Sequence, residues 1–318
     1  MTPTQLRAFA AVVRLGSVKQ AAGELNVSES AVSLLVGQLR KELGDQLFTR
    51  TAVGLAFTPG GLRLASRAAE LLGLQDRTVL EVSQAGRGRR LLRVAASSLF
   101  AEHAAPGLIK MFAGRADDLD VELSVSNPNR FSTLLVSRAA DVAIGPQPGN
   151  LDAAVICRSF MKYKLVLVVG PEHPFAKGNI HAHQLREQIW LLGPSGATDG
   201  SSVSKLLHRF GVPEEHQQIF QSHAAALDEA KRSKGVAVAL ASAVAHDLSS
   251  GHLVRLNGPQ LQIDAVWCTL TLAARDTPPA ASELTRFVST PRAIQGMLRG
   301  AGVSVGHFRP SIHVTLWS

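Results

Sequence analysis

The chain has little of what marks secreted, zinc-binding or membrane proteins. Its 318 residues include only two cysteines. These are Cys157 and Cys268, which are far apart in sequence and form no CxxC pair, so neither a disulfide framework nor a zinc cluster is indicated. No apolar stretch approaches the ~18 residues that span a bilayer, and no signal-peptide pattern is present. The sequence therefore predicts a cytoplasmic protein with reduced, buried thiols and no membrane partner.

Signatures of catalysis are also absent. The sequence contains no P-loop, nucleophile elbow or HExxH motif. Two SxxK tetrapeptides occur, at 159–162 and 202–205, but without the SDN and KTG patterns that accompany them in hydrolases of that class. His181 and His183 have no cysteine or acidic partner at ligand spacing and are interpreted as a surface pair. We expect no enzyme, no metal site and no cofactor.

Apolar residues and positive charge are what the chain does have. Hydrophobic residues make up 46% of the sequence, enough for the cores of two or three compact units. The formal net charge is +8, and residues 1–90 hold 12 Lys and Arg against 7 Asp and Glu. This basic N-terminal region predicts an anionic partner, and nucleic acid is favoured over a membrane. A basic surface that is only solvated would have the same excess of Lys and Arg.

Three short helices are predicted near the N-terminus. Residues 2–5 form a capping box with proline at the first helical position, and the helix should end at Gly16. Ser17 begins a second short helix, and Ser28 caps a third. Apolar residues recur on one side of the third helix at spacings of three and four, which predicts its buried stripe: Val32, Val36, Leu39 and Leu43.

The other side of the third helix carries small or polar groups. Two short helices joined by a tight turn, the second exposing such residues, have the geometry of a recognition helix in the major groove of DNA. An ordinary solvated surface is the alternative. The candidate DNA-binding residues here are Ser28, Glu29, Ser30, Ser33, Leu34, Gly37 and Lys41. Residues 45–61 predict a small β-wing, on which Arg50 is either a phosphate or minor-groove contact or a plain surface arginine.

A long helix is predicted after the wing. Apolar residues recur at helical spacing from Leu62 to about Val82, before a basic, glycine-containing stretch at 86–90. A helix of ~25 residues is roughly 37 Å long. Since one of that length outside a domain core needs a partner, we predict a dimerisation helix.

The remainder of the chain alternates strands with helices. Apolar strands are expected at 91–96, 121–126 and 141–145, with helices at about 105–113 and 131–138 between them. This βαβαβ order predicts a parallel sheet. A second run of strands and helices begins near residue 164, and a strand at 265–274 is expected to return to the first lobe. Two such lobes, joined where the chain crosses twice between them, form a cleft. A cleft of this kind is the usual binding place for a small ligand.

Candidate effector-binding residues lie where loops precede predicted helices at the mouth of this cleft. Helix N-termini offer free amide donors and partial positive charge, which suits an anionic or carboxylated metabolite. Each residue could equally be a cap or turn residue without a ligand. The candidates are Ser97, Ser98, Asn129 and Arg130 in lobe one, and Ser195, Gly196 and Thr198 in lobe two.

Four segments in order and spacing resemble the LysR-type transcriptional regulator family: "VSESAVS" at 27–33, "LRKELG" at 39–44, "LFTR" at 47–50 and "TPGG" at 58–61. The resemblance implies an N-terminal winged helix-turn-helix (mainly α), a long linker helix, and a two-lobed α/β effector domain similar to periplasmic binding proteins. It further implies binding to partly palindromic operator double-stranded DNA as a dimer or tetramer, a small-molecule effector, and contact with RNA polymerase if the protein is an activator.

The expected boundaries follow from this resemblance. They are 1–61 for the DNA-binding domain, 62–90 for the linker helix and hinge, 91–301 for the effector domain, and 302–318 for a C-terminal extension. Within the effector domain, lobe one covers about 91–163 and 265–301, and lobe two about 164–264. A final edge strand is expected near residues 312–316.

The chain also departs from the family pattern. Glu29 replaces a usual glutamine, Leu34 and Gly37 replace longer polar side chains, and Asp199 replaces a frequent arginine in the effector loop. Glu29 is expected to accept from a cytosine amino group and Leu34 to pack on a thymine methyl. The alternative function is a cytoplasmic solute-binding module whose front domain binds protein. Steep weakening of DNA binding with salt would separate the two hypotheses.

Overall fold

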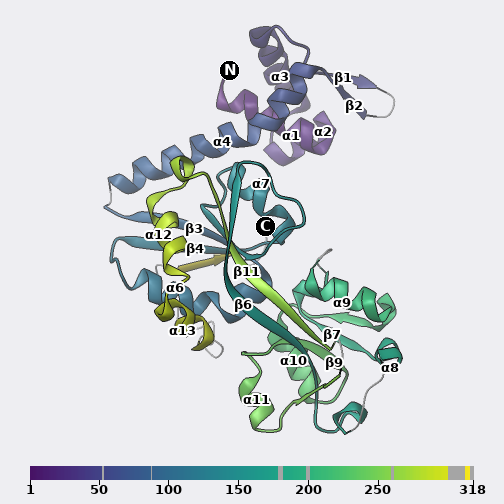
Figure 1. Ribbon diagram of the computed structural model, residues 1–318. Coiled ribbons are helices and arrows are strands. Elements are labelled where there is room, and N and C mark those ends of the chain that lie inside the picture. The colour runs from purple at the N-terminus through teal and green to yellow at the C-terminus, as the bar shows by residue number, and fades with distance from the viewer. Residues whose placement is uncertain are drawn as a thin grey trace. The chain divides into compact units, whose positions relative to one another are not determined.

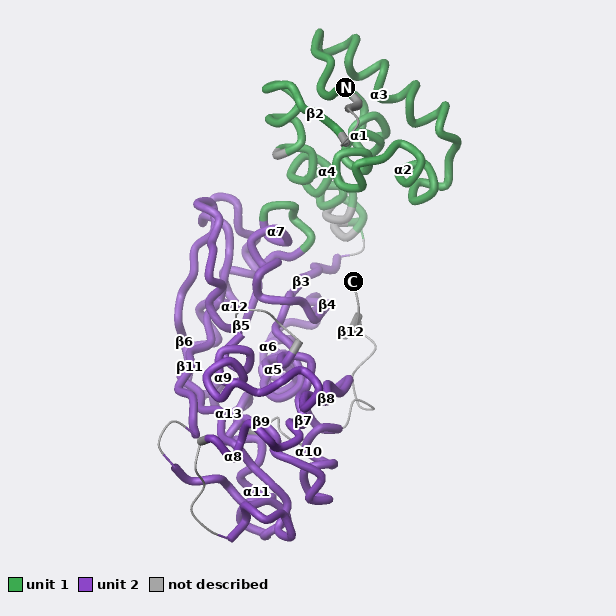
Figure 2. The backbone as a smooth tube through the Cα atoms, turned by 90° about the vertical axis from the view of Figure 1, so that its right-hand side faces the viewer, with its two compact units in different colours: residues 1–87, 136–139 green, residues 88–135, 140–318 purple. Residues whose placement is uncertain are grey.

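A computed structural model describes most of the chain as two compact units. One unit comprises Met1–Arg87 and Val136–Ala139, and the other Gly88–Leu135 and Ala140–Ser318 (Figure 2). No helix among the described residues is long and apolar enough to cross a membrane. The structure describes residues 1–51, 54–86, 88–177, 182–197, 201–258, 261–299 and 312–315.

The first unit begins with the three predicted helices, α1 (Pro3–Leu15), α2 (Val18–Leu25) and α3 (Glu29–Leu43) (Figure 1). The capping box at Thr2 is confirmed, because its hydroxyl accepts from the Gln5 amide while the Gln5 side chain accepts from the Thr2 amide. The caps at Ser17 and Ser28 are also confirmed. Local capping chemistry therefore sets where each helix starts.

The apolar stripe of α3 packs against α1 and α2 to form the core of the first unit. Val32, Val36 and Leu39 are buried, together with Phe9 on α1. The prediction is wrong for Leu43, which is 44% exposed. Leu43 is the last residue of α3, followed by the left-handed C-cap Gly44, so the helix has already passed the core.

The wing is a two-stranded antiparallel hairpin of β1 (Phe48–Thr51) and β2 (Gly54–Phe57). Helix α4 (Pro59–Ala85) follows with 27 residues. Its cap is Thr58, whose hydroxyl accepts from the Gly61 amide at 2.9 Å and donates to Asp45 Oδ1 at 2.6 Å. A Cβ on Gly61 would overlap the Leu47 carbonyl, so close packing explains this glycine in the TPGG segment.

The second unit is built on one ten-stranded sheet in the order β12-β4-β3-β5-β11-β6-β9-β7-β8, with β10 paired to β6. The predicted βαβαβ unit is confirmed, because β3 pairs in parallel with both β4 and β5. The final strand β12 adds in parallel to β4 at the sheet edge, as expected. The strands are β3 (Arg90–Ala96), β4 (Leu119–Val125), β5 (Val142–Pro146), β6 (Val155–Val169), β7 (Trp190–Leu192), β8 (Gln217–Ile219), β9 (Val236–Leu240), β10 (Val254–Arg255), β11 (Gln262–Leu272) and β12 (Ile312–Thr315).

Helices cover the two lobes of this sheet separately (Figure 1). Lobe one carries α5 (Ser98–His103), α6 (Ala105–Ala113), α7 (Phe131–Val136), α12 (Pro279–Phe287) and α13 (Pro291–Arg299). Lobe two carries α8 (Ala182–Arg186), α9 (Ser202–Phe210), α10 (His223–Lys231) and α11 (Ala245–Ser249). Short 3-10 turns are η1 (Pro128–Arg130), η2 (Pro174–Ala176), η3 (Pro194–Ala197), η4 (Glu214–His216) and η5 (Ala274–Asp276). Helix α5 was not predicted; it is only six residues long and ends where α6 begins with its own proline.

Two long antiparallel strands, β6 and β11, run through both lobes (Figure 1). The return of the late strand is confirmed by β11. The first crossing starts at Val155 rather than at the predicted 164, because polar residues such as Arg158 and Lys162 interrupt the apolar pattern of its first half. A register shift between Trp267 and Cys268 marks a β-bulge in the crossing.

The two cysteines, distant in sequence, lie on these neighbouring strands. Cys268 pairs with Ser159 across the ladder, and Cys157 is two residues from Ser159. Both are free thiols; Cys268 is buried as predicted, but the prediction is wrong for Cys157, which is only half-buried. Burial and the neighbouring Cys268 thiol raise the pKa of Cys157 to about 12, so this thiol stays protonated at neutral pH.

Candidate nucleic-acid interface and inter-lobe site

The predicted recognition surface lies on one exposed side of α3, opposite the buried stripe. All its members are exposed, and Leu34 most notably, at 62%. Leu34 therefore adds little to the buried core of the unit. We call this set the α3 face: Ser28, Glu29, Ser30, Ser33, Leu34, Gly37 and Lys41.

Few of these side chains are used by the fold. Ser28 Oγ accepts from the Ala31 amide at 3.2 Å and lies 2.8 Å from Ser30 Oγ. Both serine side chains are therefore used at the N-terminus of α3. Within the described part of the chain, Glu29, Ser33 and Lys41 make no hydrogen bond or ion pair. A Cβ on Gly37 would meet no atom within 4 Å. Tertiary packing therefore does not explain the residue types on the α3 face.

Arg40, on the flank of the α3 face, is committed to the wing. Its Nη2 donates to the Phe48 carbonyl at 2.6 Å, and its guanidinium lies 4.6 Å from the Phe48 ring centroid. Arg50, the wing candidate, lies on β1 opposite Leu55 of β2, and its side chain is outside the described residues. Lys41 is thus the exposed cation that α3 offers from its recognition surface.

The lobe-one candidates follow the ends of two parallel strands, β3 for the serines and β4 for Asn129 and Arg130. Ser97 precedes α5 and is only 6% exposed, and among the described residues its Oγ has no hydrogen-bond partner. A Cβ on Gly145 would lie 3.0 Å from Ser97 Oγ and 2.9 Å from the Phe131 ring, so the starts of α5 and α7 meet there. Ser98 is half-buried, and Asn129 and Arg130 are exposed on η1 immediately before α7.

The lobe-two candidates lie on the 3-10 turn η3 rather than at an α-helix start. Ser195 and Gly196 are both half-buried, and the Gly196 amide donates to the Gly193 carbonyl at 2.9 Å. The hydroxyl of Ser201, the N-cap of α9, donates to the Ser195 carbonyl at 2.9 Å. Thr198 lies outside the described residues.

A carboxylate from lobe one caps a helix of lobe two, and sequence analysis missed this contact. Glu102 on α5 accepts at Oε2 from the backbone amide of His223 at 2.8 Å and from its Nδ1 at 2.9 Å. Its Oε1 accepts from the Ala224 amide at 2.7 Å. The N-terminus of α10 therefore already holds an anion, supplied by the protein itself. A separation of 121 residues hides this contact from any local pattern.

His223 continues the contact to the predicted effector loop. Its Nε2 lies 2.9 Å from Ser195 Oγ, and its ring fits because residue 193 is glycine, where a Cβ would overlap it. Serine, histidine and carboxylate in this order resemble a hydrolase triad. These contacts form a hydrogen-bond relay between the lobes.

The electrostatics of this relay favour an ionised Glu102 carboxylate. Burial raises the pKa of Glu102, but its hydrogen bonds and its attraction to His223 outweigh this and hold that pKa at about 2. Burial lowers the pKa of the adjacent His103 to about 4, against the attraction of Glu102. The His103 and His223 ring centroids are 5.8 Å apart. We call these residues the Glu102 cluster: Glu102, His103, Ser195 and His223.

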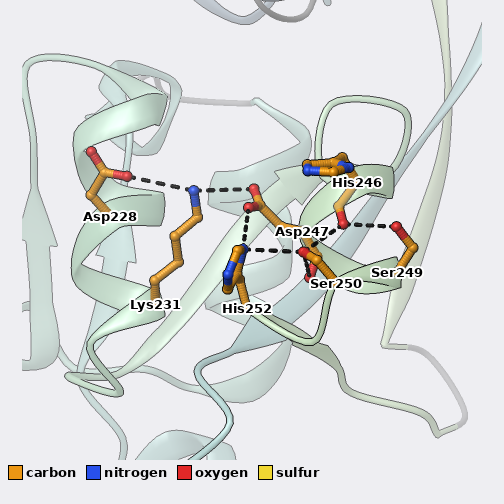
Figure 3. Close-up of polar contacts among 7 residues, drawn as sticks. All are labelled: Asp228, Lys231, His246, Asp247, Ser249, Ser250 and His252. Atoms are coloured by element: carbon orange, nitrogen blue, oxygen red, sulfur yellow. Dashed lines mark hydrogen bonds and ion pairs between the residues drawn. The ribbon is translucent and has the colours of Figure 1, made fainter.

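A second polar network lies at the other end of α10. Lys231 Nζ lies 3.6 Å from Asp228 and 3.1 Å from Asp247, and His252 Nδ1 lies 3.6 Å from Asp247 (Figure 3). Ser250 Oγ joins His252 to the carbonyl of His246. Because Lys231 pairs with a carboxylate on each of the two helices, this network fixes α11 to α10.

Comparison with known proteins places both units in one family. Residues 3–62 match the model of the bacterial regulatory helix-turn-helix protein, lysR family, and residues 85–290 match the LysR substrate binding domain. An uncharacterized HTH-type transcriptional regulator of Mycobacterium tuberculosis is 55% identical over 321 residues, covering all of both chains. The RuBisCO operon transcriptional regulator of Allochromatium vinosum is 28% identical, covering 89% of this chain and 94% of its own.

Solved structures agree on the fold. Full-length CbnR in complex with its target DNA matches with a TM-score of 0.55 at 19% identity, covering 94% of this chain and all of that one. A mutant of OxyR from Corynebacterium glutamicum matches with a TM-score of 0.54 at 18% identity, covering 94% of both chains. The chain belongs to the LysR family. It is a LysR-type transcriptional regulator with a helix-turn-helix domain and an effector-binding domain.

Proposed function

We propose that the α3 face enters the major groove of a partly palindromic operator, with Arg50 on the wing contacting phosphate or the minor groove. The exposed, unbonded side chains of the α3 face, set opposite a buried stripe, carry this proposal. Lys41 supplies charge for phosphate contact. Ser33, Glu29 and Leu34 are small enough to fit against the base edges in the groove. The place of action is the cytoplasm, where chromosomal DNA is.

We infer that α4 pairs with a second copy of the chain, giving a dimer that can assemble further to a tetramer. This helix has 27 residues and exposes apolar side chains along its length, which an isolated helix in water does not favour. Self-association also suits a partly palindromic operator, since protein symmetry then matches DNA symmetry. The exposed apolar residues are Leu62, Leu71, Leu74, Val79 and Val82.

We also infer that a small, anionic effector binds between the lobes and changes how the protein bends or spaces its operator. The unpartnered hydroxyl of buried Ser97 supports a ligand there, since buried polar groups ordinarily have partners. Contact with RNA polymerase follows if the protein is an activator. The proposed contacts are Ser97, Ser98, Asn129, Arg130, Ser195, Gly196 and Thr198.

DNA binding is tested with purified full-length protein and fragments of its own upstream region, titrated with salt. Lys41→Ala should weaken operator binding and reduce the slope of log affinity against log salt by about one for each copy of the chain on the operator, since each copy loses one phosphate contact. Ser33→Ala and Arg50→Ala should weaken binding as well. Lys110→Ala, which removes the same charge from an exposed position on α6, is the matched control and should change neither quantity.

The outcome that contradicts the proposal is equally plain. Binding that is equal for all DNA sequences and indifferent to Lys41→Ala, Ser33→Ala and Arg50→Ala would show that the α3 face does not read an operator. The front unit would then be better explained as a protein-interaction domain on a solute-binding module.

A further inference from the structure

The Glu102 cluster brings together three side chains of the types that bind metal ions. Glu102 and His103 are adjacent on α5 of lobe one, and His223 is the first residue of α10 in lobe two. One ligand atom from each lies within 4.8 Å of the others. Among the described residues, no other group of three or more histidine, cysteine or acidic side chains brings its ligand atoms this close together.

The least explained member of the group is His103. Its side chain is buried, with the residue only 9% exposed, yet within the described part of the chain its ring nitrogens have no hydrogen-bond partner. Its contacts are with the other two members, the His223 ring at 5.8 Å and the charge of Glu102. Because none of the described hydrogen bonds uses them, the His103 ring nitrogens are available as metal ligands.

We propose that Glu102, His103 and His223 together bind one divalent transition-metal ion of the Zn²⁺ class across the two lobes. Two imidazoles and one carboxylate form a donor set typical of zinc and its neighbours, whereas Mg²⁺ and Ca²⁺ prefer oxygen ligands alone. Zinc is ordinarily four-coordinate. Three protein ligands at about 2.0–2.2 Å therefore leave one position open for water. Because the ligands come from α5 and α10, the ion holds lobe one to lobe two.

The acidic cluster around Lys231 in lobe two is less suited to a metal ion. It also gathers carboxylates and an imidazole, from Asp228, Asp247 and His252 (Figure 3). Its centre is the Lys231 ammonium, which lies within ion-pair distance of both carboxylates and repels a cation. The Glu102 cluster has no lysine or arginine ion pair among its described contacts.

Metal binding would also be transmitted to the effector loop. The His223 nitrogen facing Glu102 is Nδ1, which now lies 2.9 Å from the carboxylate as its hydrogen-bond donor. Coordination through Nδ1 releases that proton to solvent, and the coordinated ring carries its single proton on Nε2. In the metal-bound state Nε2 therefore donates to Ser195 Oγ. This consequence rests on the proposed effector role of Ser195, whereas the metal site itself does not.

The test is calorimetric titration of Zn²⁺ into full-length protein without a histidine tag, stripped with EDTA and measured without DNA. Wild type should bind one ion per chain, and Mg²⁺ should not bind. His103→Phe, which removes a ligand that makes no hydrogen bond, should keep the melting temperature and weaken binding more than about 100-fold. Glu102→Gln keeps acceptor oxygen for α10 and should weaken binding at least about tenfold.

The matched control is His208→Ala, which removes an exposed histidine of α9 and should leave the affinity unchanged. Absence of Zn²⁺ binding by wild type overturns the proposal, as does equal binding by wild type and His103→Phe. Since no DNA is present, the result is independent of whether the protein reads an operator. Loss of salt-sensitive DNA binding would overturn the proposed function and leave the metal site intact.

Discussion

The α3 face and the Glu102 cluster are both polar, but they differ in how far their side chains take part in tertiary hydrogen bonds. Glu29, Ser33 and Lys41 on the α3 face are exposed and, within the described residues, without a tertiary bond. In the Glu102 cluster, by contrast, one carboxylate accepts from two backbone amides and an imidazole across the lobe boundary. The first surface should therefore matter for binding with little effect on stability, and the second should matter for both.

The largest expected effect is that of Glu102→Ala. The substitution leaves the His223 ring and the amides of His223 and Ala224 without their acceptor, so we expect a loss of about 3 kcal/mol in the free energy of unfolding of the second unit. Urea denaturation monitored by tryptophan fluorescence measures it, since Trp190 and Trp267 are buried in that unit. Glu215→Ala, at an exposed position on η4, should change stability by less than about 0.5 kcal/mol. Equal effects of the two would mean that Glu102 is only a surface residue.

A smaller effect is expected where the first unit does have a tight tertiary contact, at the base of the wing. Gly61→Ala forces a methyl group against the Leu47 carbonyl and should cost about 2 kcal/mol, because backbone cannot move aside as a side chain can. Thermal unfolding of the full chain measures this cost. A stability equal to wild type would show that the segment joining α3 to the wing relaxes freely.

These two positions also show how far the sequence could predict the structure. Gly61 lies in a recognisable TPGG segment, and the caps at Thr2, Ser17 and Ser28 depend on residues only three apart, so local rules found them. The Glu102 contact joins residues 121 apart through α5, a six-residue helix that has no detectable period. Its one available signal was an unassigned acid before a histidine, which is too common to indicate a site.

Ser28→Ala brings the comparison to the α3 face itself. This serine is the exception on that surface because it caps α3, so its loss should cost about 1 kcal/mol of stability. Ser33→Ala, one turn further on, removes a hydroxyl that has no partner among the described residues and should be neutral to stability. Thermal unfolding of both variants separates capping from recognition. A destabilised Ser33→Ala would show that the fold does use this face.

Gly37→Ala sharpens the contrast most, although its effect on stability is the smallest. Alanine replaces glycine inside a helix with open space around it, so the free energy of unfolding should rise by about 0.8 kcal/mol. Gly23→Ala on α2 meets the same open space and should give the same gain. If DNA approaches the backbone of α3 closely, the added methyl at Gly37 should nevertheless weaken operator binding, while Gly23→Ala leaves it unchanged.

A variant that folds better and binds worse cannot be explained by damage to the unit. Melting temperature and operator affinity measured on the same two preparations therefore test the role of the α3 face directly. Unchanged affinity in Gly37→Ala would mean that this part of α3 stays away from the groove. The interface would then be confined to the N-terminal half of the helix, from Ser28 to Leu34.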